Sequence, residues 1–531
     1  MKYKTIELSH TNEIIQTYGV NSLMAKVIES KKIDQEQFKS FMDPHLVYHD
    51  FSLFEEADET LERIEEAIAN KEKICIYGDY DCDGILATTI LVQAFHERGV
   101  EVGYHIPNRF TDGYGLNTTR VEQMAEKGYS LIITVDNGIK AFDAVEKAGE
   151  LGIDVIITDH HAFDGEVPVA YSIIHTKMSP KYPFKEICGG FIAYKLAAAL
   201  LKHHDPYLFT LASITTISDM MPLLDENRSL VRRGLQFMKQ YKYSSLELLK
   251  GNRNYDVTTI GFTIAPRINA FGRLPELVNP VYLVKYFLKE ADPAYLEKIS
   301  NYASKINSKR QSMTTSLYKE AVTDTSSSCL FYGSENMHEG LVGLVAGKYT
   351  REYEQPAFVM HYNPKEEIYK GSARGIDGFN IYNFFTHHED LFVQYGGHAK
   401  AGGFTITKSN YPLVYDALMN DIKGCHFEAS ESVIPITLTD TTIPNVESLD
   451  LLAPFGEENK APLFILEVDR LSEGKHLKFH LGDDQVSALA FNKGQLYDEL
   501  VHKDSMTLVG TLSINVFRGN KSINFIVEDI L

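Results

Sequence analysis

The sequence has few cysteines and no long hydrophobic run. The five cysteines are scattered, odd in number and without a C-x-x-C pair, so neither a zinc knuckle nor a disulfide framework is supported. They are Cys75, Cys82, Cys188, Cys329 and Cys425. No uncharged apolar stretch reaches the roughly 18 residues of a membrane-spanning helix, and the first residues lack the apolar core of a signal peptide. We therefore expect a cytoplasmic protein.

Positive charge is also scarce. Fifty-two basic residues stand against seventy-two acidic ones, which gives a formal net charge of -20. This balance argues against a protein that coats nucleic acid or anionic membranes indiscriminately, although it leaves room for a local basic groove. Hydrophobic residues make up 44% of the 531 residues, as in ordinary globular proteins. Because a domain typically has about 150 residues, the length predicts three or four domains.

The hydrophobic pattern predicts five segments. In residues 1–70, apolar positions recur at the spacing of short amphipathic helices. We expect this N-terminal segment, the lead-in, to pack on the next domain. In 71–290, short apolar runs alternate with helices, and strands apolar on both faces indicate a doubly wound parallel sheet in an α/β domain. A polar connecting helix is expected in 291–325 and a smaller, glycine-rich α/β domain in 326–425. Residues 430–531 alternate like the strands of a small β-barrel.

The loop GDYDCDG, residues 78–84, carries the densest acidic motif. Asp79, Asp81 and Asp83 lie two residues apart between a predicted strand and a predicted helix, so their side chains can converge on one cation. An EF-hand calcium loop is excluded, because its twelfth position would be Ile90 instead of glutamate and a strand precedes it. The loop taken alone also fits a turn with a helix N-cap.

Further acidic and histidine residues follow other apolar runs. Asp136 comes directly after SLIITV, and Asp159, His160 and His161 come directly after DVIIT. Because ligands bind at the carboxyl ends of strands in such sheets, we expect these side chains to meet. Asp219 follows a helical stretch and would reach the site from outside the sheet. Carboxylates with one or two imidazoles suit Mn²⁺ or Mg²⁺, and this chemistry is typical of phosphate substrates.

The motifs DYDCDG, VDNG, DHH and SDMMPL, in this order, resemble those of the DHH phosphoesterase superfamily. The segments IPNRFTDGYGL, APRINAFGRL, GSARGIDGFNI and QYGGHAKAGGF are similar to its RecJ family of single-strand-specific DNA exonucleases. This resemblance implies a DHH domain, a DHHA1 domain and a C-terminal OB fold. OB barrels bind single strands by base stacking and a charged groove.

The resemblance also implies roles for individual residues. The metal ligands would be Asp81, Asp83, Asp136, His160 and Asp219. Asp79 and Asp159 would bind the metal or support its ligands, and His161 would contact the scissile phosphate, so that His161, Asp159 and Asp136 carry the catalysis. Some members have a histidine ligand at the position of Tyr77. The sequence therefore leaves open whether one or two metal ions bind.

Phosphate-binding candidates lie further along the chain. Arg109, Ser372 and Arg374 are candidates for gripping phosphate, since guanidinium groups match phosphate oxygens in two-point contacts. Ordinary surface solvation is the competing interpretation for exposed arginines. His398 lies among glycines, where bare backbone can approach a phosphate. Arg267, Asn269 and Arg273 would face the strand path, whereas core packing is expected for Phe271.

The resemblance implies metal-assisted hydrolysis of single-stranded DNA, 5′ to 3′, to mononucleotides, in DNA repair and recombination. The expected partners are single-stranded DNA, a single-strand-binding protein and a helicase, and a monomer is expected. Two alternatives stay open. One is a DHH/DHHA1 nanoRNase or cyclic-dinucleotide phosphodiesterase, against which the β-rich C-terminal segment argues. The other is an inactive scaffold that only binds single strands, against which the complete set of aspartates and histidines argues.

Overall fold

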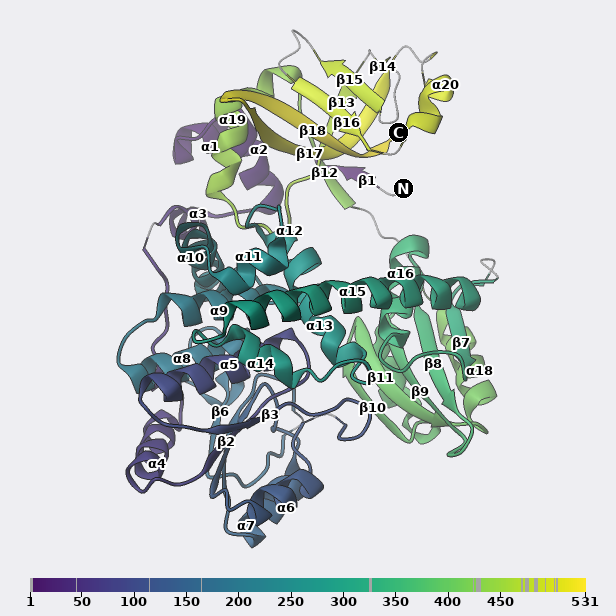
Figure 1. Ribbon diagram of the computed structural model, residues 1–531. Helices are drawn as coiled ribbons and strands as arrows, with labels where there is room; N and C mark the ends of the chain where they lie inside the picture. The colour runs from purple at the N-terminus through teal and green to yellow at the C-terminus, as the bar shows by residue number, and fades with distance from the viewer. Residues whose placement is uncertain are drawn as a thin grey trace. The chain divides into compact units, whose positions relative to one another are not determined.

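The structure is a computed structural model (Figure 1). It describes residues 3–43, 45–113, 115–163, 165–323, 327–423, 425, 431–468, 471–472, 477–481, 486–491, 493–500, 502 and 505–531. The chain forms two compact units, one of Met1–Leu46 with Glu428–Leu531 and one of Val47–Phe427. Within the described ranges, every helix is too short or too polar to cross a membrane.

The larger unit begins with a parallel five-stranded sheet of order β3-β2-β4-β5-β6. Alternate strand residues enter different cores: Ile76 and Ile133 pack in one hydrophobic cluster, and Cys75 and Ile132 in another. Both faces are thus covered by helices, which confirms the doubly wound α/β fold. The strands are β2 (Ile74–Tyr77), β3 (Gly103–His105), β4 (Leu131–Val135), β5 (Asp154–Thr158) and β6 (Ser172–Ile174). The helices of this part are α4 (Ala57–Ala69), α5 (Cys82–Glu97), α6 (Thr118–Glu126), α7 (Phe142–Glu150), α8 (Gly189–Leu201) and α9 (Pro206–Ser218).

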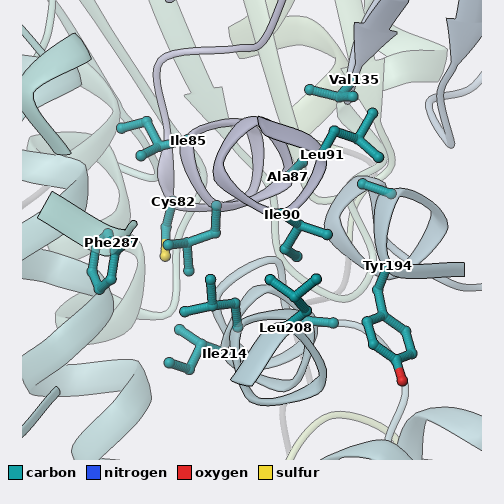
Figure 2. Packing of buried hydrophobic residues seen from close by; sticks show 14 of the residues in the cluster. Cys82, Ile85, Ala87, Ile90, Leu91, Val135, Tyr194, Leu208, Ile214 and Phe287 are labelled. Carbon is teal, nitrogen blue, oxygen red and sulfur yellow. The ribbon is translucent and has the colours of Figure 1, made fainter. Parts of the chain in front are cut away.

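Helix α5 is buried along nearly its whole length. It packs against α8 and α9, where Ile90 and Leu91 share one hydrophobic cluster with Tyr194, Leu208 and Ile214 (Figure 2). A helix that is apolar all round is held rigidly by its neighbours. The acidic loop at its N-terminus is therefore fixed in place.

A helical region follows the sheet. Its helices are α10 (Asp225–Tyr241), α11 (Ser244–Lys250), α12 (Val257–Thr259), α13 (Ala265–Arg273) and α14 (Val281–Phe287). Between α12 and α13 the chain makes a π-helical turn, η3 (Ile260–Ile264). Pro266 has no N–H to donate to the carbonyl of Phe262, so a wider turn accommodates the proline without ending the helix.

Helix α15 (Pro293–Ala321) leads to the second domain of this unit. Its mixed sheet has the order β10-β11-β9-β8-β7, antiparallel except for the β7–β8 pair. The strands are β7 (Leu330–Ser334), β8 (Ala357–Asn363), β9 (Ile368–Arg374), β10 (Gln394–His398) and β11 (Ala401–Thr407), with helices α16 (Val342–Tyr353), α17 (Ile381–His387) and α18 (Tyr411–Ile422). This is the predicted smaller α/β domain.

The other unit is built around an eight-stranded sheet of order β1-β12-β13-β17-β18-β16-β15-β14 in its described residues. The strands are β1 (Tyr3–Thr5), β12 (Glu431–Pro435), β13 (Phe464–Val468), β14 (Leu471–Ser472), β15 (Leu477–Leu481), β16 (Val486–Ala490), β17 (Met506–Phe517) and β18 (Asn520–Ile530). The helices are α1 (Thr11–Tyr18), α2 (Ser22–Lys31), α3 (Gln35–Met42), α19 (Ile443–Ser448) and α20 (Tyr497–Leu500). The β-rich character expected of the C-terminal segment is confirmed.

The first 46 residues differ from the expectation that all of 1–70 packs on the following domain. Leu23, Met24, Val27 and Ile28 of α2 share a core with strands from the end of the chain. Only the later part of the lead-in, including α4, packs on the parallel sheet. The apolar stripe of α2 was visible in the sequence, but a stripe does not specify which surface covers it.

Candidate metal centre and phosphate grip

Acidic side chains follow three neighbouring strands at the carboxyl edge of the parallel sheet. Asp79 comes after β2, Asp136 after β4 and Asp159 after β5, and all three are buried. Asp136 has φ of 62°, a left-handed backbone that non-glycine residues rarely adopt, and its N–H donates to the carbonyl of Thr158 at 3.0 Å. Such strain persists where the surrounding structure holds a side chain in a working position.

The N-terminus of α5 places two more carboxylates. Asp81 is the N-cap and accepts a hydrogen bond from the N–H of Gly84 at 3.1 Å. Asp83 accepts from the N–H groups of Gly189 and Gly190, each at 2.8 Å. Gly189 and Gly190 are the first two residues of helix α8. At a helix N-terminus, unsatisfied N–H donors and the helix dipole favour a negative charge. Asp83 is thereby held as a carboxylate in the buried site.

His160 joins these groups into one cluster. Its Nε2 atom lies 3.1 Å from Asp136 Oδ1, 3.5 Å from Asp219 Oδ2 and 3.8 Å from Asp83 Oδ2. One ligand atom each from Asp79, Asp81 and Asp136 lies within 4.8 Å of the others. Asp219 arrives from the C-terminus of α9, outside the sheet, as the sequence required. The structure thus brings the five residues expected as metal ligands together, with Asp79 beside them.

The buried polar atoms of this cluster fit a divalent cation. Asp79 Oδ1, His160 Nε2 and Asp219 Oδ2 are buried without a hydrogen-bond partner in the described part of the chain. Burial and the neighbouring carboxylates raise the pKa of Asp79 and Asp219 well above the ordinary value, and they raise the pKa of Asp83 to about 6. A bound cation of charge +2 removes this repulsion and satisfies the orphaned atoms.

The two histidines are in different electrostatic states. Burial and the charge of His161 lower the pKa of His160 to about 3, so His160 is the neutral imidazole that binds metals. Burial also opposes the charging of His161, but the hydrogen bond from its Nδ1 to Asp159 Oδ1, at 2.8 Å, outweighs it and raises the pKa of His161 to about 9. His161 therefore holds a proton at neutral pH.

Asp159 uses its oxygens to organise this motif. Oδ1 accepts from the backbone N–H groups of His160 and His161 at 2.7 and 3.0 Å, and Oδ2 accepts from the N–H of Ile139 at 3.0 Å. Burial raises the pKa of Asp159, but the contacts with His161 outweigh it and hold the pKa below the ordinary range. Of the two roles expected for Asp159, this geometry favours support of the histidines over metal binding.

Four arginines form a second cluster, the arginine cluster: Arg109, Arg273, Arg310 and Arg374. Burial and the charges of the other three lower the pKa of Arg273 to about 9. In the described part of the chain, none of the four has a carboxylate within ion-pair distance. Arg374 donates to Ser372 Oγ at 2.7 Å, and Arg273 donates to the carbonyl of Gly340 at 3.3 Å. Partly buried, mutually repelling cations without a counterion form a site for an anion.

The arginine cluster lies beside the metal-ligating cluster. The guanidinium of Arg109 stands 5.2 Å from the ring centre of Tyr80, in the acidic loop, and its charge acts on Asp79. Arg109, Arg273, Ser372 and Arg374, all predicted from the sequence, therefore converge.

Three other predicted residues have different surroundings. Asn269 accepts a hydrogen bond from the N–H of Cys82 at 2.7 Å, so it holds the acidic loop. Arg267 donates to the carbonyl of Leu249, away from the arginine cluster, and His398 is exposed at the end of β10. Phe271 is fully buried, as expected. Tyr77 donates to the carbonyl of Gly115 at 3.1 Å, so its hydroxyl is engaged outside the ligand set.

Sequence reasoning missed Arg310 and the pair Gly189 and Gly190. A Cβ on Gly189 would lie 2.5 Å from Cβ of Asp136, and one on Gly190 would lie 2.8 Å from Asp83 Oδ1. Only glycine lets α8 begin against the two carboxylates. The signals were a Gly-Gly pair opening an apolar helix and the basic run SKR in the polar helix, neither of which is specific by itself.

Comparisons with known proteins agree with this site. Three family models match: the DHH family N-terminal domain over residues 73–217, the DHHA1 domain over 325–424 and the RecJ OB domain over 434–529. The single-stranded-DNA-specific exonuclease RecJ of Bacillus subtilis is 34% identical over 500 residues, which are 89% of this chain and 63% of that protein. The RecJ of Thermus thermophilus is 30% identical over 86% of this chain and 68% of its own length.

A solved structure extends the likeness to the fold and the metal. The crystal structure of Thermus thermophilus RecJ in complex with Mn²⁺ matches with a TM-score of 0.84 and 26% identity, covering all of this chain and 79% of that one. The acidic and histidine cluster described above supplies carboxylate and imidazole ligands suited to such an ion. Sequence, domain content and structure agree, and the chain belongs to the RecJ family.

Proposed function

We propose that this protein is a metal-dependent exonuclease that hydrolyses single-stranded DNA from the 5′ end to mononucleotides, in DNA repair and recombination. One observation carries the proposal: a buried cluster of carboxylates and a neutral histidine lies beside four arginines that have no carboxylate within ion-pair distance among the described residues. The relatives named single-stranded-DNA-specific exonucleases support it. The Bacillus subtilis relative is longer than this chain, so its whole activity is part of the proposal.

The metal ligands would be Asp81, Asp83, Asp136, His160 and Asp219, with Asp79 beside them. One or two bound Mn²⁺ or Mg²⁺ ions would supply a water of lowered pKa and neutralise charge on the phosphate. The side chains keep the site in the right charge state, because the α8 N-terminus stabilises Asp83 and burial keeps His160 neutral.

His161 would act on the phosphate oxygens. Its Nδ1 is held by Asp159, so Nε2 is the ring atom that can donate a hydrogen bond or a proton to the scissile phosphate. The raised pKa of His161 keeps that proton in place at neutral pH. Asp159 would orient the imidazole and stabilise its charge, as carboxylates behind catalytic histidines commonly do.

The arginine cluster would bind the phosphate at the 5′ end of the strand. Arg374 and Ser372 are held together by a hydrogen bond, and Arg109 reaches from the other domain of the same unit. A strand whose terminal phosphate is held there presents its next linkage to the metal centre, which produces 5′ to 3′ polarity. A single-strand-binding protein and a helicase are proposed partners, because both keep DNA single-stranded.

Two alternatives are less well supported. A nanoRNase or cyclic-dinucleotide phosphodiesterase would not need the C-terminal domain that matches the RecJ OB model. A binding scaffold would not need buried ligand atoms without partners, which cost free energy unless a cation fills the site.

The test is cleavage of 5′-labelled and 3′-labelled single-stranded oligonucleotides, with a duplex control, in Mn²⁺, Mg²⁺ and EDTA. Wild type should release the 5′ label as a mononucleotide, leave a shrinking ladder from the 3′ label and stop in EDTA. Asp136→Asn should bind DNA without cutting it, and Arg310→Gln should lose affinity for 5′-phosphorylated ends, whereas the exposed Arg233→Gln should behave as wild type.

Other results would redirect the assignment. Intact long strands together with cleaved dinucleotides would indicate the nanoRNase class. DNA binding without cleavage in either metal would indicate the scaffold.

A further inference from the structure

A cavity of about 520 Å³ lies between α15, the loop of residues 335–339 and Phe110. Its volume is in the range of pockets that enclose small organic ligands. None of the roles assigned above uses it. Its walls come from both domains of the larger unit.

One wall of the cavity is aromatic. Phe110 is 37% exposed and meets the ring of His338 edge to face, with ring centres 5.6 Å apart. The His338 ring is fixed, because its Nδ1 accepts from the N–H of Gly340 at 3.1 Å and its Nε2–H donates to Glu276 at 3.2 Å. A partly exposed phenyl ring beside a fixed imidazole is a surface on which a flat ring can stack.

One face of α15 also lines the cavity. Met313 and Leu317 supply apolar surface, and Ser312 and Ser316 are small enough to leave the space open. Helix α15 has few large apolar residues on this face because its serines border the cavity. Asn336 and His361 offer polar groups at the rim, and the His361 ring is oriented by donation from Nδ1 to the carbonyl of Met337 at 2.5 Å.

The charges of the cavity disfavour a phosphate inside it. The negative charges of Glu335 and Glu339 offset the positive charge of Lys309. The cavity therefore lacks the excess of positive charge that the arginine cluster has. Its walls nevertheless adjoin the arginine cluster at three points of the chain. Phe110 follows Arg109, Lys309 precedes Arg310, and Gly340, whose carbonyl accepts from Arg273, lies two residues after His338.

We propose that this cavity receives the base of the 5′-terminal nucleotide while the arginine cluster holds its phosphate. The ligand class is a nucleobase, since the cavity combines an aromatic wall, an apolar helix face and a few polar groups beside an anion site. This inference rests on the proposed function, because it requires a strand end at the arginine cluster. It adds that the enzyme senses the terminal base as well as the terminal phosphate.

The test compares two oligonucleotides that carry the same labelled 5′ phosphate, one with a normal terminal nucleotide and one with an abasic terminal nucleotide. Release of the label in the first turnover is measured for wild type, Ser316→Trp, which fills the cavity, and Thr315→Trp, which adds the same bulk on α15 outside it. Wild type and Thr315→Trp should release the normal end about tenfold faster than the abasic end, the effect of one lost stacking contact.

Ser316→Trp should cut both ends at the slow rate that wild type shows on the abasic end. That residual rate also reports that the variant is folded. Phe110→Ala, which removes the stacking ring without filling the cavity, should lose most of the preference in the same way.

Equal rates for the two ends in wild type, or a full preference in Ser316→Trp, would overturn the cavity assignment while leaving the proposed exonuclease intact. No release of label by wild type from either end would overturn the proposed function, and the cavity assignment with it.

Discussion

Asp159 shows how a single residue organises the site through its hydrogen bonds. Three N–H donors and the imidazole of His161 occupy its two oxygens. The adjacent histidines thus receive opposite roles: one imidazole is neutral and faces the carboxylates, and the other is charged and held by Asp159. The difference arises from burial and one hydrogen bond, since the two residue types are the same.

Asp159→Asn should lower cleavage by about 10- to 100-fold while Mn²⁺ still binds, because outer carboxylates tune their partners by such factors. The amide lacks the charge that raises the pKa of His161. Cleavage rate and Mn²⁺ affinity by calorimetry are the two measurements. Asp416→Asn, an exposed aspartate on α18, is the matched control. An equal loss of metal binding and cleavage would instead make Asp159 a ligand.

At the scale of elements, the start of α8 is tightly constrained. Its first N–H groups hold Asp83, and its first residue leaves no room for a Cβ beside Asp136. The helix therefore both stabilises one carboxylate and sets the position of another. Helix α8 also packs against α5, the helix that carries Asp83. Both partners of the Asp83 contact are therefore held rigidly.

Gly189→Ala should cost about 100-fold in cleavage, because the new methyl group would displace the Asp136 side chain and small misplacements in a reacting site have such effects. Gly149→Ala in α7 is the matched control. A Cβ there has no atom within 4 Å, so this change should stabilise the protein by about 0.5–1 kcal/mol without altering cleavage. Cleavage and thermal unfolding of both variants are measured, and normal cleavage by Gly189→Ala would refute the constraint.

Helix α2 is tied to its unit by an ion pair between partly exposed Lys26 and buried Asp440. Lys26 Nζ lies 2.8 Å from Asp440 Oδ2, and Ser22 donates to Asp440 Oδ1 at 2.8 Å. Burial raises the pKa of Asp440, but the hydrogen bonds from Lys26, Thr437 and Ser22 outweigh it and lower the pKa below 3.8. Because the folded pKa is depressed, the stabilisation is present above the unfolded pKa and is lost as pH falls through the folded one.

Asp440→Asn should therefore reduce the free energy of unfolding of this unit by about 1–3 kcal/mol at pH 7. The difference from wild type should shrink once the pH falls below the unfolded value of 3.8. Urea unfolding at pH 7 and pH 3, compared with the exposed Asp498→Asn, measures it. A difference independent of pH would show that packing, not charge, holds the contact.

At the scale of the whole molecule, the two ends of the chain fold together. Residues of α2 complete the core of the sheet formed by the last hundred residues, while residues 47–427 form a unit with their own cores. The long connection between these ends contains the entire metal centre. The C-terminal sheet therefore depends on residues more than 400 positions away in sequence.

Deletion of residues 1–46 should unfold the C-terminal sheet and leave the larger unit intact. Leu23, Met24, Val27 and Ile28 are fully buried or nearly so, and losing even one large core side chain costs about 2–5 kcal/mol. A domain of total stability about 5–15 kcal/mol cannot lose all four. Calorimetry should show two transitions in the full chain and one in the truncated chain. Two unchanged transitions would contradict the shared core.

The sequence by itself determined the parallel sheet and the placement of Asp79, Asp136 and Asp159 at its carboxyl edge. These follow from short-range periodicity and from a topological rule that holds for any such sheet. The resemblance to known motifs added Asp219, and guanidinium chemistry made Arg109 and Arg374 candidates for phosphate binding, although no local pattern places these residues at the site.

Only the tertiary structure decided which of these groups meet and in what state. The positions of Arg310 and Gly189, the cavity beside α15, and the pairing of α2 with the C-terminal sheet all depend on contacts between segments distant in the chain. Protonation depends on burial and on the distances between charges, which a sequence does not contain. The opposite charge states of His160 and His161 are the clearest case, since neighbouring identical residues differ only in their surroundings.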